Sequence, residues 1–264
     1  MNLGTKLKAA ILACGLGLSG LAGAANVSDY YLFDGDSSTA WRISNGVASA
    51  FSTYRFGYPA AIRDTIWLGH RDDAIAQEYT LTGIATGNTS SGGNAFTQLL
   101  DGATGSNGIN FGVECCGATN SVTTANADWS GQQVLFNLSE NGAGIAYDPI
   151  NDSLYVSGFS TTILHYGLTG VLLGTIDFGQ SLVGLAYEEF TDSFWGWNRS
   201  TQSLVEFDRS GGVLQDFVVA NVGGNPYGGE MSVIGSSMVP EPGSLALLGL
   251  GMAGLAAMRR KRRA

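Results

Sequence analysis

The feature that most constrains this chain is a repeat with a fixed offset of forty residues. Residues 144–147 (GIAY) and 152–156 (DSLYV) recur as residues 184–187 (GLAY) and 192–196 (DSFWG). Each copy continues with two more short runs, separated by a glycine turn, in which apolar and polar residues alternate. This pattern predicts four short strands in each repeat. Four short strands in about forty residues are what one blade of a β-propeller needs.

Three weaker copies precede the two strong ones. Residues 56–86 and 99–136 follow the same strand order, the second with a longer middle loop, and residues 29–51 supply three strands without a first one. A lone predicted strand at residues 229–234 has no blade after it. The sequence therefore predicts a single all-β, five-bladed propeller in which this last strand completes the N-terminal blade. The alternative is a β-sandwich, whose strands also recur every ~8–12 residues.

The first 25 residues have the pattern of a secretory signal peptide. Two lysines precede an apolar stretch, and the small residues Ala22, Ala24 and Ala25 predict cleavage after Ala24 or Ala25. The alternative is a lipoprotein box that ends at Cys14. Against it, the chain stays apolar for eleven further residues.

The last 26 residues, 239–264, form a segment of three parts. Val239, Pro240, Glu241 and Pro242 are expected to be extended, because proline fixes its own φ and disfavours helix in the residue before it. Residues 244–258 carry no charge and predict a helix of about 22 Å, which spans a ~30 Å hydrocarbon core only with help from snorkelling side chains. A buried amphipathic helix is the alternative, but this segment has no polar face. The positive-inside rule places the terminal basic cluster on the cytoplasmic side. The cluster consists of Arg259, Arg260, Lys261, Arg262 and Arg263.

This order of parts resembles the PEP-CTERM sorting signal of Gram-negative envelope proteins. The resemblance implies that an exosortase, a membrane-embedded transpeptidase-like enzyme, recognises the Pro-Glu-Pro motif and removes the tail. It also implies export through the inner membrane, transient anchoring by the C-terminal helix, and a final place at the cell envelope, at the surface or outside the cell. Association with exopolysaccharide and biofilm is a further implication. The repeats in residues 26–238 resemble those of secreted NHL- or YncE-like propellers.

The region between the signal peptide and the basic cluster is strongly acidic. It holds six Arg and 22 acidic residues, which give a formal charge of −16. Nucleic acid is therefore not an expected partner, because binding to phosphates needs cationic patches. The same acidity favours solubility outside the cell and weak attraction of cations.

Residues with catalytic or metal-binding chemistry are few in the repeats. His70 and His165 are predicted to hold similar inner-strand positions and to be packed, and no zinc-hydrolase or serine-esterase motif is present. The acidic turns at Asp34-Gly-Asp36, Asp72-Asp73 and residues 148–152 offer oxygen ligands for Ca²⁺, but Asp and Asn more often only form turns. We therefore expect no catalytic residue, no metal site and no cofactor.

Cys115 and Cys116 are the only cysteines that remain after removal of the signal peptide. In an oxidising compartment, such a pair favours a disulfide between adjacent residues, with two buried thiols as the alternative. Two cysteines alone are a poor metal site, because soft-metal sites need further Cys or His ligands.

The tryptophans give a weaker indication about binding. Trp67 and Trp195 hold equivalent repeat positions and are expected in the core, whereas Trp129 and Trp197 lie nearer to turns and are the candidates for exposed, sugar-stacking rings. The sequence favours a non-enzymatic envelope or matrix protein whose propeller binds a polysaccharide or a surface partner. The alternatives are a propeller enzyme that acts on a glycan or lactone, and a structural protein with no specific ligand.

Overall fold

A computed structural model describes residues 28–91, 98–117 and 120–232, which all belong to one compact unit. The predicted signal peptide (residues 1–25) and the C-terminal segment (residues 239–264) with its predicted membrane helix lie outside these residues. Within the part of the chain that is described, no helix is long and apolar enough to cross a membrane.

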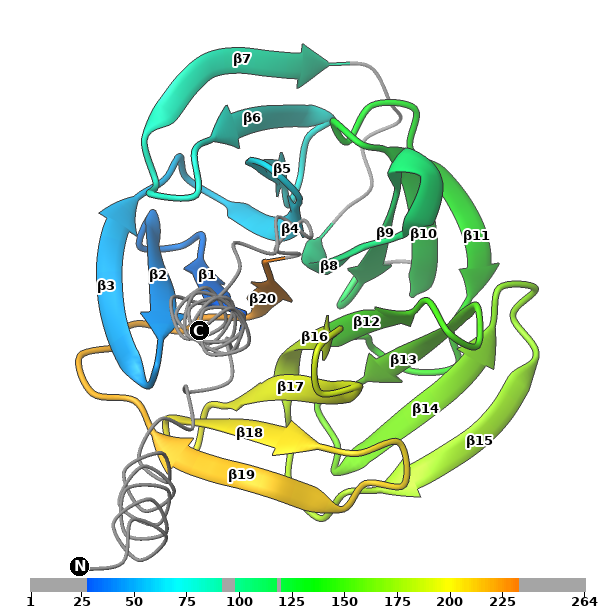
Figure 1. The fold of residues 1–264 in the computed structure, drawn as a ribbon. Helices are drawn as coiled ribbons and strands as arrows, with labels where there is room; N and C mark the ends of the chain where they lie inside the picture. The colour runs from blue at the N-terminus through cyan, green and yellow to red at the C-terminus, as the bar shows by residue number, and fades with distance from the viewer. Residues whose placement is uncertain (1–27, 92–97, 118–119, 233–264) are drawn as a thin grey trace, which may run out of the picture. The chain divides into compact units, whose positions relative to one another are not determined.

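The described residues form five antiparallel sheets of four strands each around a central axis (Figure 1). The five-bladed propeller is therefore confirmed, and the β-sandwich is wrong. Blade 1 contains β20 (Gly228–Met231), β1 (Tyr30–Asp34), β2 (Thr39–Ser44) and β3 (Val47–Ser52). Blade 2 contains β4 (Gly57–Ile62), β5 (Ile66–His70), β6 (Ile75–Tyr79) and β7 (Ala85–Ser91).

The other three blades follow in chain order, and the first strand of each lies nearest the axis (Figure 1). Blade 3 contains β8 (Leu99–Thr104), the short 3₁₀ helix η1 (Ser106–Gly108), β9 (Ile109–Glu114), β10 (Ser121–Asn126) and β11 (Gln133–Asn137). Blade 4 contains β12 (Gly144–Asp148), β13 (Ser153–Ser157), β14 (Thr162–Gly167) and β15 (Leu172–Asp177). Blade 5 contains β16 (Val183–Glu188), β17 (Ser193–Asn198), β18 (Ser203–Phe207) and β19 (Val213–Val218).

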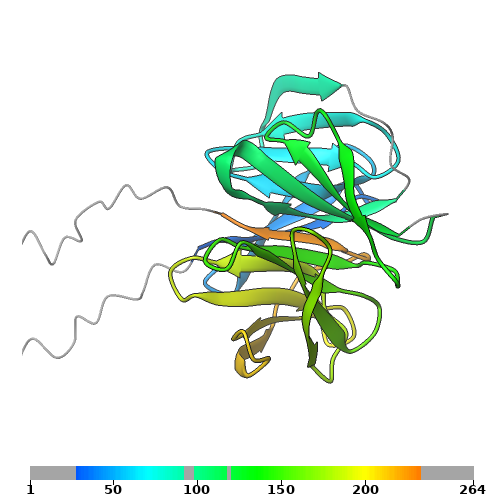
Figure 2. The ribbon, with the colours of Figure 1, turned by 90° about the vertical axis from the view of Figure 1, so that its right-hand side faces the viewer.

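The ring closes as the sequence predicts, because the last strand completes the first blade. β20 pairs with β1 in antiparallel register, from Tyr30 opposite Met231 to Phe33 opposite Gly228. In the side view, β20 (orange) runs through the middle of the propeller (Figure 2). Every strand of the five sheets lies within residues 28–232, so the sheets close without residues from either end of the chain.

The repeated residues form the tight turns between the first and second strands of blades 4 and 5. Asp152 and Asp192 adopt positive φ values of 49° and 53°, which Asp tolerates better than most residues. Each also accepts a hydrogen bond from a repeated tyrosine, at 2.8 Å from Tyr147 and 2.9 Å from Tyr187. The forty-residue repeat thus encodes the same turn, and the same hydrogen bond from tyrosine to aspartate, twice.

Apolar side chains fill the five seams between neighbouring blades. The seam between blades 5 and 1 buries Trp41, Trp195 and Trp197, and the seam between blades 3 and 4 buries Phe111 and Tyr147. Similar clusters fill the other three seams. Burial of apolar surface between blades is therefore the main source of stability, since each sheet alone would leave both faces in water.

The expectation that Trp129 and Trp197 are exposed is wrong. Each is 1% exposed. Trp129 has a positive φ of 62° that turns it back onto small residues of blade 2, where its Nε1 donates to the carbonyl oxygen of Trp67 at 2.9 Å. A position near a turn in the sequence therefore did not indicate exposure, because Trp129 and Trp197 both lie in seams between blades.

Two further sequence expectations need correction. The long middle loop expected in blade 3 contains β10, which pairs with both β9 and β11. Val122 is its only large apolar residue, so its hydrophobic pattern was too weak to recognise. The two histidines do not hold similar inner-strand positions: His70 ends the second strand of its blade, and His165 lies on the third.

Candidate functional site

The centre of the propeller is occupied by a buried aspartate, Asp101, on the innermost strand β8. Its Oδ2 accepts the backbone N–H groups of Ile145 on β12 (2.7 Å) and Leu185 on β16 (3.0 Å), and its Oδ1 accepts that of Gly229 on β20 (2.8 Å). The innermost strands of different blades do not pair with one another, so the N–H groups on their inner edges need other acceptors. One carboxylate thus connects four of the five blades.

Burial governs the charge state of this carboxyl group. The Asp101 side chain is 0% exposed, and desolvation raises its pKa well above the ordinary value, against the opposing effect of the N–H donors. The nearby Glu230 raises the pKa of Asp101 further.

A second buried carboxyl group, Glu230 on β20, lies closer to the end of the inner strands. Its Oε2 accepts the backbone N–H of Thr104 on β8 at 2.6 Å, and its Oε1 accepts that of Met231 at 2.8 Å. Glu230 is 4% exposed, and burial raises its pKa to about 8, although the N–H donors and the guanidinium group of Arg63 act in the opposite direction. Its carboxyl group therefore changes charge near neutral pH.

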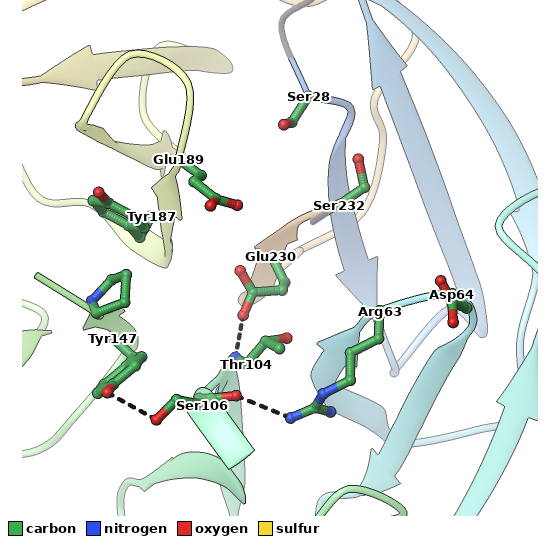
Figure 3. A pocket seen from close by; sticks show the side chains of 12 residues that line it. Ser28, Arg63, Asp64, Thr104, Ser106, Tyr147, Tyr187, Glu189, Glu230 and Ser232 are labelled. Carbon is green, nitrogen blue, oxygen red and sulfur yellow. Dashed lines mark hydrogen bonds between the residues drawn. The ribbon is translucent and has the colours of Figure 1, made fainter. Parts of the chain in front are cut away.

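Glu230 lines a cavity of ≈ 330 Å³, here called the axial cavity, to which all five blades contribute (Figure 3). Ser28 and Ser232 come from the two ends of blade 1, and Arg63 and Asp64 directly follow β4. Blades 3, 4 and 5 supply the remaining wall, which includes Thr104, Ser106, Tyr147, Tyr187 and Glu189. The chain therefore enters and leaves the described propeller at the rim of the same cavity.

Two repeated tyrosines form an aromatic part of the cavity wall. Tyr147 and Tyr187 occupy equivalent positions on β12 and β16, and the hydroxyl group of Tyr147 also lies 3.1 Å from the Oγ of Ser106 (Figure 3). Burial raises the pKa of both tyrosines, to about 12 for Tyr187. Both hydroxyl groups therefore stay protonated at neutral pH and donate hydrogen bonds to the carboxylates of Asp152 and Asp192.

Arg63 is the cation of the axial cavity, and neutral groups hold it in place. Its Nη1 donates to Asn110 Oδ1 at 2.8 Å, and its Nη2 donates to the carbonyl oxygens of Ile109 (3.0 Å) and Gly105 (3.2 Å). Burial lowers its pKa, against the effect of Glu230. Three carboxyl groups, those of Asp64, Glu189 and Glu230, line the same cavity.

This arrangement can bind a neutral molecule that carries several hydroxyl groups. Carboxylates and carbonyl oxygens accept hydrogen bonds from hydroxyl groups, and serine hydroxyls both donate and accept them. Tyrosine rings offer an apolar face beside these polar groups. A polyanion suits the wall poorly, because acidic side chains outnumber the arginine and like charges repel.

The two histidines singled out in the sequence do not line this cavity. His165 Nε2 lies 2.8 Å from Ser153 Oγ, and its ring stacks on Tyr155 with centroids 4.3 Å apart. His70 Nδ1 accepts the backbone N–H of Asp72 at 3.1 Å. Both side chains therefore have hydrogen-bonding and packing roles.

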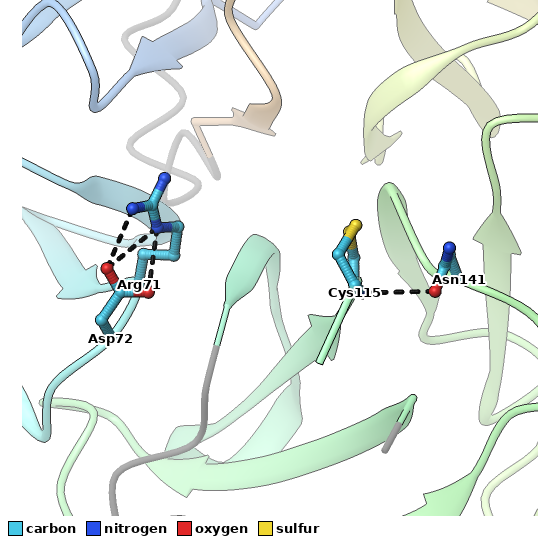
Figure 4. The surroundings of a disulfide bond; sticks show 5 residues. Arg71, Asp72, Cys115 and Asn141 are labelled. Carbon is cyan, nitrogen blue, oxygen red and sulfur yellow. Dashed lines mark hydrogen bonds and ion pairs between the residues drawn. A yellow bond between two sulfur atoms is a disulfide. The ribbon is translucent and has the colours of Figure 1, made fainter. Parts of the chain in front are cut away.

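Cys115 and Cys116 form a disulfide directly after β9, close to Asn141 (Figure 4). The backbone N–H of Cys115 donates to the carbonyl oxygen of Gln98 at 3.0 Å, and that of Cys116 donates to Asn141 Oδ1 at 3.2 Å. Figure 4 also shows Arg71 beside Asp72 in the corresponding loop of blade 2. The disulfide constrains the loop locally, and the two hydrogen bonds tie it to the segment before β8 and to the segment before β12.

The acidic turns considered as calcium ligands bind protein groups instead. Asp34 accepts the N–H groups of Asp36 and Asn225, and Asp148 accepts two hydrogen bonds from Arg209 at 2.9 Å each. Among residues 28–91, 98–117 and 120–232, no group of three or more His, Cys, Asp or Glu side chains is placed to hold a metal ion.

Sequence reasoning missed the carboxyl groups at the axis. Asp101 and Glu230 each lie in a run that the sequence predicts as a strand, at residues 99–102 and 229–234, and the structure places them in β8 and β20. A charged residue within an innermost strand was the available signal, because such a residue needs a specific partner when it is buried.

Comparison with known proteins supports the sorting signal and the fold. Residues 239–263, outside the described part, match the PEP-CTERM protein-sorting motif. This motif implies export, membrane anchoring before cleavage and processing by an exosortase. The sequence matches no curated protein.

Several solved structures resemble the propeller at low sequence identity. A chain in the crystal structure of a nidogen/laminin complex aligns with a TM-score of 0.54 and 11% identity, over 74% of this chain and 81% of that one. Proteins of unknown function from Bacteroides thetaiotaomicron (TM-score 0.46, 13% identity, 61% and 43% coverage) and Bacteroides caccae (0.47, 11%, 75% and 75%) also align. At this identity, the first likeness shows the fold alone.

Proposed function

We propose that this protein is a non-enzymatic, exosortase-processed protein of the cell envelope or extracellular matrix whose axial cavity binds a neutral polysaccharide. The observation that carries the proposal is the composition of the cavity wall. Two tyrosine rings, serine hydroxyls and three carboxyl groups surround a volume of ≈ 330 Å³, and all five blades contribute. Pockets of this size suit small ligands or a few units of a chain.

The charge of the protein supports a neutral ligand over an acidic one. The region between the two terminal signals carries a formal charge of −16. Part of that charge, Asp64 and Glu189, lines the axial cavity beside a single arginine, whereas Glu230, with a pKa of about 8, is largely neutral at pH 7. An acidic polysaccharide would be repelled at long range and would meet carboxylates at short range. The sorting signal implies association with exopolysaccharide and biofilm. We therefore propose that the ligand is one of the uncharged polysaccharides of such a matrix.

Binding of residues 26–238 to neutral oligosaccharides by calorimetry tests this function. Tyr187→Ala removes one ring of the cavity wall, and we expect it to weaken binding about tenfold or more, the upper range for loss of one aromatic contact. Phe159→Ala is the matched control, because Phe159 is an aromatic residue outside the cavity that is 43% exposed. Equal affinities for both variants, or no binding by the unmodified protein, would rule the proposal out.

A second candidate function is a hydrolase that acts on a glycan or lactone. The observation in its favour is Glu230, a buried carboxyl group in the cavity with a pKa of about 8, which can donate a proton at neutral pH. Turnover of a glycan or lactone panel that is lost in Glu230→Gln would support the enzyme. Absence of turnover across the panel would leave the binding function.

A further inference from the structure

A small pocket of ≈ 80 Å³, here called the arginine pocket, lies at the end of blade 5 that faces away from the axial cavity. β16 ends at the axial cavity, where Glu189 follows it. β17 runs antiparallel to β16, so Arg199, directly after β17, lies at the opposite end of the blade. Arg199 lines the arginine pocket together with residues 222–226, which lead from β19 to β20. The pocket has room for about two or three groups of the size of a water molecule, at ~30 Å³ each, and therefore suits a small group of a ligand.

Arg199 is a cation with unused hydrogen-bond donors. Its Nη2 donates to Asn225 Oδ1 at 3.0 Å, and its other N–H groups donate to no described residue. Asn225 lines the same pocket, so this bond holds the guanidinium group at the pocket wall. No carboxylate of the described residues forms an ion pair with Arg199, in contrast to Arg42, Arg71 and Arg209. A guanidinium group with free N–H groups is suited to binding a carboxylate through two parallel hydrogen bonds.

The surroundings of the arginine pocket leave room for an anion. Among the described residues that line it, none is acidic. The carboxylate of Asp34 lies behind the lining, where its Oδ2 accepts the backbone N–H of Asn225 at 2.9 Å, but Asp34 is 1% exposed. At physiological salt, exposed charges more than about 8 Å apart are largely screened. Most of the formal charge of −16 therefore acts on this pocket only weakly.

Aromatic rings lie next to Arg199. Its Cζ is 4.2 Å from the ring centroid of Tyr227, and the ring of Phe159 packs edge-on against the same tyrosine with centroids 6.1 Å apart. Tyr227 is half-buried, whereas Phe159 is 43% exposed. An exposed aromatic ring offers a surface on which the apolar face of a sugar ring can stack. A cation with free donors and an exposed ring thus lie close together on this face.

We propose that the arginine pocket binds the carboxylate of an acidic sugar, such as a uronic acid unit of a polysaccharide. The carboxylate accepts hydrogen bonds from the free N–H groups of Arg199, and a sugar ring of the same chain stacks on Phe159. A uronic acid carries its carboxylate directly on the sugar ring, so neighbouring parts of one chain make both contacts.

This site gives the protein a role beyond binding in the axial cavity. The two sites lie at opposite ends of the blade, and the arginine pocket does not depend on the axial cavity or its ligand. A protein with both sites can connect a neutral polysaccharide to an acidic one.

Calorimetric titration of residues 26–238 with tetragalacturonate in about 0.15 M NaCl tests this site. Arg199→Met removes the guanidinium group, and we expect it to weaken binding about tenfold or more, a change of about 1.4 kcal/mol. It should leave the affinity for the fully methyl-esterified tetrasaccharide, which has the same chain without charges, within about twofold. Arg55→Met is the matched control: Arg55 also stacks on an aromatic ring, that of Phe56 at 4.4 Å, but does not line the pocket, and its replacement should change the affinity less than about twofold.

Two further variants and one further ligand complete the test. Phe159→Ala, at an exposed position, should weaken binding of tetragalacturonate about threefold or more through loss of the stacked ring. Tyr187→Ala, in the axial cavity, should leave this affinity within about twofold. A tetraglutamate peptide, which carries carboxylates without sugar rings, should bind at least about tenfold more weakly than tetragalacturonate.

The outcomes separate this site from the axial cavity. If tetragalacturonate does not bind, or if Arg199→Met and Arg55→Met weaken it equally, the arginine pocket proposal is wrong, whereas binding of neutral oligosaccharides in the axial cavity is unaffected. Equal affinity for the peptide would also overturn the proposal, since the site would then recognise carboxylates without the sugar. Loss of tetragalacturonate binding in Tyr187→Ala would place the acidic ligand in the axial cavity and would contradict both proposals.

Discussion

The replacement Glu230→Gln should change how the stability of the propeller depends on pH. Burial raises the pKa of Glu230 to about 8, whereas the same group in the unfolded chain has an ordinary pKa of about 4.3. Between these values, the native state holds one proton more than the unfolded state. Its contribution to stability is therefore complete below about pH 4.3, falls as the pH rises, and is lost once the pH passes about 8.

The size of the effect follows from the one proton involved. One proton corresponds to about 1.4 kcal/mol per pH unit, so the free energy of unfolding should fall by about 3 kcal/mol from pH 5 to pH 7.5 on account of Glu230. Glutamine cannot titrate and removes this slope. It also leaves the N–H of either Thr104 or Met231 without an acceptor, which lowers stability by about 1–3 kcal/mol at every pH. The variant should therefore be less stable at pH 5 and should approach or exceed the wild type near pH 7.5.

Urea unfolding of residues 26–238, followed by tryptophan fluorescence at pH 5, 6, 7 and 7.5, measures this difference. Asp101 also has a raised pKa, but it is present in both proteins, so the difference in slope reports mainly Glu230. Glu189→Gln is the control, because Glu189 is an exposed carboxyl group in the same cavity, and it should keep the wild-type slope. Parallel curves for Glu230→Gln and wild type over this range would refute the reasoning.

Three further replacements test the packing and the ion pairs by the same urea assay. Asp101→Ala leaves three buried N–H groups without their acceptor and should lower the free energy of unfolding by about 3 kcal/mol or more, whereas a loss below about 1 kcal/mol would contradict its connecting role. Trp129→Ala should lower the free energy of unfolding by about 3–5 kcal/mol, because it leaves a cavity in the seam between blades 2 and 3. No change in this free energy would mean that the side chain is exposed. Arg209→Met should lower the free energy of unfolding by about 1–3 kcal/mol at neutral pH. The buried carboxylate of Asp148 would then lose its two hydrogen bonds from Arg209, which help to lower its pKa. Because a lowered pKa contributes stability that is lost on acidification, this difference should shrink below about pH 4, and a constant difference would count against the ion pair.

The repeat in the sequence predicted more of the fold than of the site. A fixed offset of forty residues identified the blades, and the lone strand at the C-terminal end identified how the ring closes, because both depend on local patterns. The same repeat placed Tyr147 and Tyr187 in equivalent positions, although it did not indicate that both line a cavity. Asp101 and Glu230 could not be assigned in this way, since they lie 129 residues apart and come from weak or incomplete copies. Their roles depend on which backbone N–H groups remain unpaired at the axis, and only the arrangement of all five innermost strands determines that.

Closure of the ring and binding in the axial cavity depend on the same carboxyl group. Glu230 holds the closing strand β20 to β8 through the N–H of Thr104, and it also lines the cavity. A ligand oxygen that accepts the proton of Glu230 favours the protonated form, and by linkage the protonated form binds such a ligand more tightly. Binding should then weaken above about pH 8, where the carboxylate can only accept hydrogen bonds. A ligand that donates only hydroxyl protons to Glu230 would show the opposite dependence, so the direction of the pH effect distinguishes the two modes of contact.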